Sequence, residues 1–251
     1  MKPVVVRNVK IGDGVPKICV PVVGRTREEI LKEGKNLLSR QADVAEWRVD
    51  YYQDSDDKEQ VMKTAEMLRE ILGDVPLLFT FRSKGEGGEK DISGEYYREL
   101  NLLAASSGFV DLVDVEAFFD KVSVKELLKE LHDWDVKAVV SNHDFKKTPD
   151  KEEIIRRLIY MKDLGGDIQK IAVMPNSGKD VLTLLSATLE VSESGIDCPI
   201  ITMSMGKEGM VSRISGGIFG SALTFGTAGK SSAPGQIPAE ELKKMLRILQ
   251  G

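Results

Sequence analysis

Residues 17–40, KICVPVVGRTREEILKEGKNLLSR, contain one complete structural unit: a short apolar run, a brief loop and a longer segment of mixed charge. The apolar run at 17–23 has the length and composition of a buried β-strand. The segment 26–40 carries apolar residues at helical spacing, and Thr26 followed by Glu29 is a capping box, which is typical of a helix start. The stretch therefore predicts a strand followed by an amphipathic helix.

The same alternation of strand and helix continues to the end of the chain. A second clear helix is predicted at 151–165, with Thr148 near its start as a cap and Gly165 near its end. Successive strands start about one strand and one crossover helix apart. With 17–23, the predicted strands are 43–49, 76–82, 111–116, 136–141, 168–173, 199–205 and 221–226. An alternating segment near 3–11 predicts a short β-hairpin before them.

Eight strand-helix units predict a (β/α)8 barrel, the TIM-barrel fold, as one domain over residues 1–251. An open, doubly wound parallel sheet would use the same alternation. The first strand, however, is followed by VVGRTREE and not by the G-x-G-x-x-G of a dinucleotide-binding fold. The barrel is therefore the favoured architecture.

Composition excludes several classes of function. The chain has 251 residues and a net charge of −5, with basic and acidic side chains interspersed, so a nucleic-acid surface is not indicated. Cys19 and Cys198 lie far apart in apolar runs, which favours reduced, buried thiols over a disulfide or a metal site. No signal peptide and no apolar run near the ~20 residues of a membrane span is present. We expect a cytoplasmic protein with no membrane partner and no metal or cofactor.

Ionisable residues gather where the predicted strands end, which is where a barrel keeps its active site. Since strand side chains alternate, Glu46, Arg48 and Asp50 share one face. Each group also has a structural alternative: an ion pair for Glu46 with Arg48, and a cap or solvated position for Asp50. The other ionisable residues in such positions are Arg82, Asp114, Glu116, His143, Asp144 and Lys170.

Lys170 lies in the middle of the apolar strand 168–173, where an unpaired ammonium would cost several kcal/mol. One interpretation is a buried lysine paired with a strand-end carboxylate. The other is that burial and neighbouring cations such as Arg48, Arg82 or Arg213 leave a free amine that attacks a carbonyl group. The neighbouring strand ends at His143, whose side chain suits proton transfer near neutral pH. Together they favour imine chemistry with proton transfer.

The segment 227–238, TAGKSSAPGQIP, is longer than most strand-to-helix connections and rich in Gly, Ser and Pro. It is predicted to be a lid that closes over a ligand and contributes Ser and Gln hydrogen bonds. The alternative is a flexible surface turn.

In order along nearly the whole chain, the sequence resembles type I 3-dehydroquinate dehydratase, the Schiff-base enzyme of the shikimate pathway. The blocks that carry the resemblance are EWRVD, PLLFTFRS with EGGE following, LVDVE, SNHDF, KIAVMP, PIITMSM, SRISGGIFGSALTFG and SAPGQI. The resemblance implies a homodimeric lyase of aromatic amino acid biosynthesis that converts 3-dehydroquinate to 3-dehydroshikimate without a cofactor.

The resemblance also implies roles for individual residues. Lys170 would form the imine, His143 would transfer protons, Glu86 would orient His143, and Arg213 would clamp the substrate carboxylate. The remaining residues implied to contact substrate are Glu46, Trp47, Arg48, Arg82, Ser232 and Gln236, with Met203, Met205 and Phe225 as apolar walls. Pro21 stands where some family members have a serine, so a side-chain hydrogen bond there is lost.

Two other functions remain open. A class I aldolase-like enzyme also uses a barrel lysine, but it breaks a carbon–carbon bond and commonly acts on phosphorylated sugars held by a Gly-rich phosphate cup. A catalytically silent barrel that binds a metabolite or a partner protein is the second alternative.

Overall fold

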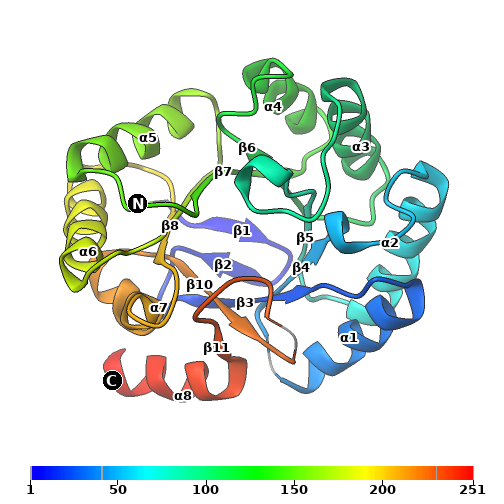
Figure 1. Cartoon of the computed structure of the whole chain (residues 1–251). Coiled ribbons are helices and arrows are strands. Elements are labelled where there is room, and N and C mark those ends of the chain that lie inside the picture. The colour runs from blue at the N-terminus through cyan, green and yellow to red at the C-terminus, as the bar shows by residue number, and fades with distance from the viewer. Residues whose placement is uncertain (1, 41, 230, 251) are drawn as a thin grey trace.

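A ring of parallel strands surrounded by helices forms the centre of the computed structural model, which describes residues 2–40, 42–229 and 231–250 (Figure 1). Neighbouring strands in the ring follow one another in the sequence. They are β3 (Lys17–Val22), β4 (Val44–Arg48), β5 (Leu77–Thr80), β6 (Leu112–Glu116), β7 (Lys137–Asp144), β8 (Ile168–Val173), β9 (Ile200–Ser204) and β10 (Leu223–Thr227). The predicted barrel and its strands are confirmed.

The ring closes between β9 and β10. There the Ala222 N–H donates to the Ile200 carbonyl at 2.8 Å, and the Thr202 N–H donates to the Ser221 hydroxyl at 3.1 Å. The short strand β11 (Ile237–Pro238) pairs in parallel with β10, along the edge of β10 that does not pair with β3. One difference in strand bounds matters for the site: β7 continues three residues past 141 and carries His143 as part of the sheet.

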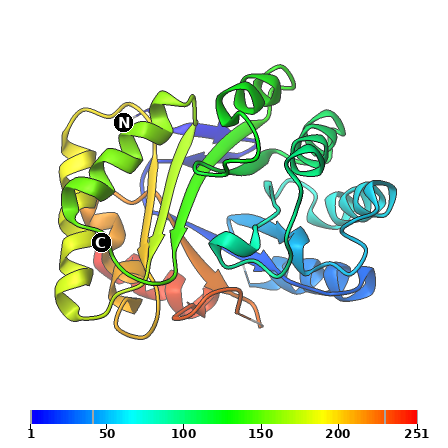
Figure 2. The same cartoon turned by 45° about the horizontal axis from the view of Figure 1, so that its top comes forward.

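Helices cover the outside of the ring. They are α1 (Arg27–Ser39), α2 (Lys58–Leu72), α3 (Gly94–Ser106), α4 (Val124–His132), α5 (Lys151–Asp163), α6 (Gly178–Glu193), α7 (Met210–Ser215) and α8 (Ala239–Gln250), with 3-10 turns η1 (Val49–Tyr51), η2 (Lys84–Glu86) and η3 (Gly216–Phe219). Figure 2 shows the strands from β7 to β9 side by side, inside α5 and α6. No helix in the described ranges is long and apolar enough to cross a lipid bilayer.

Helix starts follow the sequence only in part. The Thr26 side chain accepts from the Glu29 N–H at 3.3 Å as predicted, but the Glu29 carboxylate accepts from Arg25, one residue before the cap. The predicted cap at Thr148 is wrong. Its hydroxyl donates to the Met174 carbonyl at 3.0 Å, and α5 begins after Asp150.

The predicted hairpin is confirmed as β1 (Val4–Val6) paired antiparallel with β2 (Val9–Ile11). Val6 and Ile11 are buried in one cluster with side chains from the amino ends of the strands, such as Val44 and Leu112. Arg7 donates to Asp111 at 2.6 Å and anchors the hairpin to the start of β6. The hairpin therefore covers one end of the ring and leaves the carboxyl ends of the strands for a site.

Candidate active site

A cavity opens at the carboxyl ends of the strands, and every predicted site residue except Trp47 lines it. Lys170 and His143 come from the adjacent strands β8 and β7, which place both side chains on the inner face of the ring. The predicted residues along its walls are Glu46, Arg48, Arg82, Glu86, His143, Lys170, Met203, Met205, Arg213, Phe225, Ser232 and Gln236.

Trp47 does not reach the cavity, so its predicted contact with substrate is wrong. It alternates with Glu46 and Arg48 along β4 and therefore faces the helices. Its ring is fully buried, 5.7 Å from that of Phe79 and 6.1 Å from that of Tyr52. Trp47 is a core residue.

Lys170 is buried with its amine next to two carboxylates. Its Nζ lies 3.2 Å from Asp114 Oδ2 and 3.5 Å from Glu46 Oε1, and 4.5 Å from the centre of the Phe225 ring. The interpretation of Lys170 as a buried lysine paired with strand-end carboxylates is therefore confirmed, and cations are not its nearest charged neighbours. The resting side chain is an ion-paired lysine that faces the cavity.

Two of the three expected cations are neutralised by carboxylates of their own. Arg48 donates twice to Asp50, at 2.8 Å each, and Arg82 contacts Asp114 at 2.7 Å and Glu116 at 2.9 Å. Asp50 is completely buried, so its predicted role as a cap or solvated residue is wrong. Bidentate pairing of this kind holds a guanidinium in one orientation.

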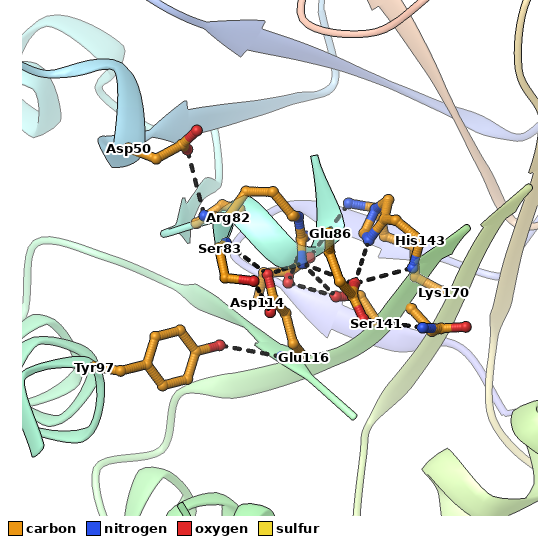
Figure 3. Close-up of polar contacts among 12 residues, drawn as sticks. Asp50, Arg82, Ser83, Glu86, Tyr97, Asp114, Glu116, Ser141, His143 and Lys170 are labelled. Atoms are coloured by element: carbon orange, nitrogen blue, oxygen red, sulfur yellow. Dashed lines mark hydrogen bonds and ion pairs between the residues drawn. The ribbon is translucent and has the colours of Figure 1, made fainter. Parts of the chain in front are cut away.

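The groups around Arg82 form a continuous buried network (Figure 3). Ser141 donates to Asp114 at 2.6 Å, and the Ser83 backbone and hydroxyl both donate to Glu116. The carboxylate that holds Lys170 is thus itself held by a guanidinium and a hydroxyl. Because each partner is satisfied, this network is a rigid floor for the cavity.

His143 contacts Glu86 through the Nδ1 edge of its ring. Both its Nδ1 and its backbone N–H lie 2.9 Å from Glu86 Oε2, and Asn142 Nδ2 donates to Glu86 Oε1 at 2.9 Å. In the described ranges no protein group bonds to His143 Nε2. That nitrogen is therefore the one available to a ligand.

Electrostatics favour a neutral His143. Burial lowers the pKa of His143 well below its usual range, and the cations Arg82, Lys170 and Arg48 act in the same direction. Burial raises the pKa of Glu86, whereas Arg82 opposes that shift. Because the Asn142 amide and the His143 backbone N–H donate to its two oxygens and Arg82 Nη1 lies 3.6 Å away, we assign Glu86 as the carboxylate and place the imidazole proton on Nδ1. Nε2 can then act as a base.

Arg213, on α7, is almost fully buried beside the cavity without a carboxylate partner in the described part of the chain. Nη2 donates to the Pro234 carbonyl at 3.1 Å, and Nε has no hydrogen-bond partner. Burial lowers the pKa of Arg213 to about 10, so the group is still cationic at neutral pH. A buried, unneutralised guanidinium is a site for an anion.

Three residues of the predicted lid, Ser232, Ala233 and Gln236, line the cavity, and Lys230 lies outside the described residues. Gln236 accepts from the Ser232 N–H at 3.0 Å and donates to the Ser232 hydroxyl at 3.1 Å, which makes a closed turn. The Gly206 N–H, just after β9, donates to Pro234 at 3.2 Å. Gly235 is required in this turn, because its φ is +77° and a Cβ there would lie 2.2 Å from the Gly206 carbonyl oxygen.

Several cavity residues were not identified from the sequence. Phe145 follows His143 by two positions, so strand alternation could have found it. Gly87 gave no such signal, because its place depends on the turn η2. The other unpredicted lining residues are Ala172 and Ala233. Pro21, where the family pattern varies, is not among the residues that line the cavity. Within the ranges 2–40, 42–229 and 231–250, no group of three or more His, Cys, Asp or Glu is arranged to hold a metal ion.

Comparisons with known proteins cover nearly the whole chain. The family model described as Type I 3-dehydroquinase matches residues 18–251. The chain is 56% identical over 250 residues to a 3-dehydroquinate dehydratase of Clostridium botulinum, with 99% of this chain and 98% of the relative covered. It is 50% identical over 248 residues to that of Clostridioides difficile, with 99% and 97% covered.

Solved structures are similar over the same length. A type I 3-dehydroquinate dehydratase from Clostridium difficile with covalently modified comenic acid has a TM-score of 0.94 at 49% identity, covering 99% of this chain and 98% of that one. The 3-dehydroquinate dehydratase from Geobacillus kaustophilus has a TM-score of 0.96 at 41% identity, covering 99% and 96%. Family model, relatives and structures all span the cavity residues, and the chain belongs to the type I 3-dehydroquinase family.

Proposed function

We propose that the chain is a hydro-lyase of aromatic biosynthesis that removes water from 3-dehydroquinate, giving 3-dehydroshikimate, through an imine on Lys170. Family membership and full-length relatives with this name support the activity. The observation that carries the mechanism is that Lys170, the free Nε2 edge of His143 and the unneutralised Arg213 line one cavity.

The first stage is imine formation. The Lys170 ammonium gives up one proton, the free amine attacks the C3 ketone to form a carbon–nitrogen bond, and the ketone oxygen takes up that proton and a second one from the nitrogen. The ketone oxygen leaves as water when the carbinolamine collapses. The resulting iminium draws electrons from C2 and acidifies the hydrogens there.

In the second stage His143 moves a proton. Nε2 takes one C2 hydrogen, and the electron pair of that bond passes into the iminium to give an enamine. The enamine expels the C1 hydroxyl, which leaves as water with the proton from His143. Hydrolysis of the remaining imine releases the product and restores Lys170. Glu86 holds the Nδ1–H throughout, so the ring keeps its orientation.

The remaining residues bind the substrate in this proposal. Arg213 takes the carboxylate, because it is the cavity guanidinium that lacks a carboxylate of its own in the described ranges. Arg48 and Arg82 offer only the N–H groups that Asp50, Asp114 and Glu116 leave free. The hydroxyl groups are assigned to Glu46, Arg48, Arg82, Ser232 and Gln236, and the apolar walls to Met203, Met205 and Phe225.

The aldolase-like alternative is weakened by charge. Barrel enzymes that bind phosphate place it at a helix N-terminus near the last strands. Here α8 has Glu240 and Glu241 in its first turn, and their charges would repel a phosphate there. A catalytically silent barrel would bind a ligand without converting it and without forming an imine on Lys170.

The purified chain is expected to convert 3-dehydroquinate to an enone product, measured by ultraviolet absorbance. Borohydride added with the substrate or the product should reduce the imine and add one ligand mass to the peptide that contains Lys170, seen by mass spectrometry. An unmodified chain under both conditions would exclude the imine. Turnover of a phosphosugar without turnover of dehydroquinate would favour the aldolase-like function.

Arg213→Met is expected to lower kcat/KM about a hundredfold, mostly through KM, because a charge-assisted carboxylate contact is lost. Arg213→Lys, which keeps the charge without the planar fork, should recover part of the loss. Steady-state kinetics and ligand titration measure both. Equal KM values in wild type and Arg213→Met would remove Arg213 from the carboxylate site.

From the family resemblance alone, we further propose that the chain acts in the cytoplasm as a homodimer. Light scattering that gives the mass of one chain at working concentration would contradict the dimer.

A further inference from the structure

A chain of hydrogen bonds runs from the outer helix α5 to the His143 ring. Arg157 Nη1, on α5, donates to Asn142 Oδ1 at 2.9 Å. Asn142 Nδ2 donates to Glu86 Oε1 at 2.9 Å, and Glu86 Oε2 lies 2.9 Å from His143 Nδ1. The mechanism above uses the last contact but not the first two.

The chemistry of these groups fixes which one donates in each of the first two hydrogen bonds. A guanidinium has only N–H donors, so the Asn142 carbonyl must face Arg157. The Asn142 NH2 then necessarily faces Glu86 as a donor. Without Arg157 the amide could turn over and present its oxygen to the Glu86 carboxylate, which would repel it. Arg157 and the Glu86 carboxylate therefore favour the same orientation of Asn142, which is otherwise ambiguous for an amide.

Arg157 is itself held in place. Its Nε donates to Glu153 Oε1 at 2.6 Å, one helical turn earlier on α5, and its guanidinium lies 5.7 Å from the centre of the Phe118 ring. Asn142 is only 7% exposed, so water does not readily replace either partner. The chain is anchored at its outer end and buried at its inner end.

We propose that Asn142, oriented by Arg157, is a positioning residue that keeps Glu86 an acceptor and thereby keeps the free lone pair of His143 on Nε2. The proposal rests on the proposed function, because it needs His143 as the base. A neutral Glu86 would donate its proton to Nδ1, which would move the imidazole proton to Nε2 and remove the base. Nothing in this chain of contacts touches Lys170.

The electrostatics have the required sign. The Asn142 hydrogen bond lowers the pKa of Glu86, against the larger effect of burial, which raises it. Loss of the donor therefore raises the pKa of Glu86. The neutral Glu86 would then persist to higher pH. The lower pH limit at which His143 is an effective base would therefore move up.

Asn142→Leu, which is similar in size but has no donor, is the test. In wild type, kcat/KM is expected to fall as acidification protonates Glu86, whose pKa is raised by burial. In Asn142→Leu this fall should move up by about one pH unit, with about a fivefold loss at the wild-type midpoint and a much smaller loss about two pH units above it. Borohydride trapping of product on Lys170 should match wild type.

Matched variants of Arg157 separate positioning from folding. Arg157→Met removes the donor at the outer end of the chain of contacts and should shift the profile in the same direction, whereas Arg157→Lys keeps a donor and should restore it. The double variant Asn142→Leu, Arg157→Met should show no larger shift than Asn142→Leu alone, because both act through one contact. If Asn142→Leu does not fold, the two Arg157 variants provide the test by themselves.

The outcomes are distinct. Shifted pH profiles with normal trapping support the proposal. Loss of activity at all pH values without a shift, or a wild-type profile in Asn142→Leu, overturns it. Absence of trapping in wild type contradicts the proposed function instead.

Discussion

Replacing Lys170 with alanine is expected to abolish turnover, with a loss on the order of 10⁴-fold or more, as removal of a covalent nucleophile causes in other enzymes. No other described lysine lines the cavity, so no second amine can supply the electron sink. Ultraviolet absorbance of the enone measures the rate. Mass spectrometry after borohydride should find no adduct.

Lys170→Met is the matched control, because it keeps the apolar stem without the amine. Both variants leave Glu46 without the Lys170 cation, whereas Asp114 keeps its contact with Arg82, and breaking a buried pair in this way costs about 3–5 kcal/mol. A lower Tm is therefore expected in each, and activity must be compared below that temperature. Turnover retained by either variant, or an adduct on another residue, would contradict the assignment of Lys170.

Replacing His143 with alanine is expected to leave imine formation possible but to stop the reaction afterwards. Loss of a general base that also returns the proton should lower kcat by about 10³-fold. Borohydride with the product should still add one ligand mass at Lys170, because the amine and its carboxylate partners are unchanged.

The contrast between the two variants is the informative result. If His143→Ala loses the adduct as completely as Lys170→Ala does, His143 is needed to form the imine and the separation of roles is wrong. Glu86→Gln provides an intermediate case, since an amide can still face Nδ1 but carries no charge. Its kcat should lie between those of wild type and His143→Ala.

The fold could be predicted because it repeats. Each unit such as 17–40 contains its own strand pattern and helix pattern, and eight of them in succession favour the barrel. Errors arose where a local signal competes with a tertiary contact. Thr148 resembles a cap by its position, but its hydroxyl bonds to the Met174 carbonyl at the end of β8 instead.

The site was predictable where strand ends and family motifs agree, and less so where packing decides. Trp47 belongs to a family motif, yet alternation along β4 turns it toward the helices. Asp50 has the appearance of a loop carboxylate, but Arg48 draws it into the interior. The contact of Arg157 with Asn142 depends on how α5 lies against β7, which no local pattern in the sequence describes.

The hairpin formed by β1 and β2 closes one end of the ring, so the cavity is open at one end only in the described structure. Val6 and Ile11 fill the amino end of the ring, so ligands enter and leave at the carboxyl ends of the strands, beside the turn at Ser232 to Gln236. Substrate, product and the water needed to hydrolyse the imine therefore all pass through the same opening.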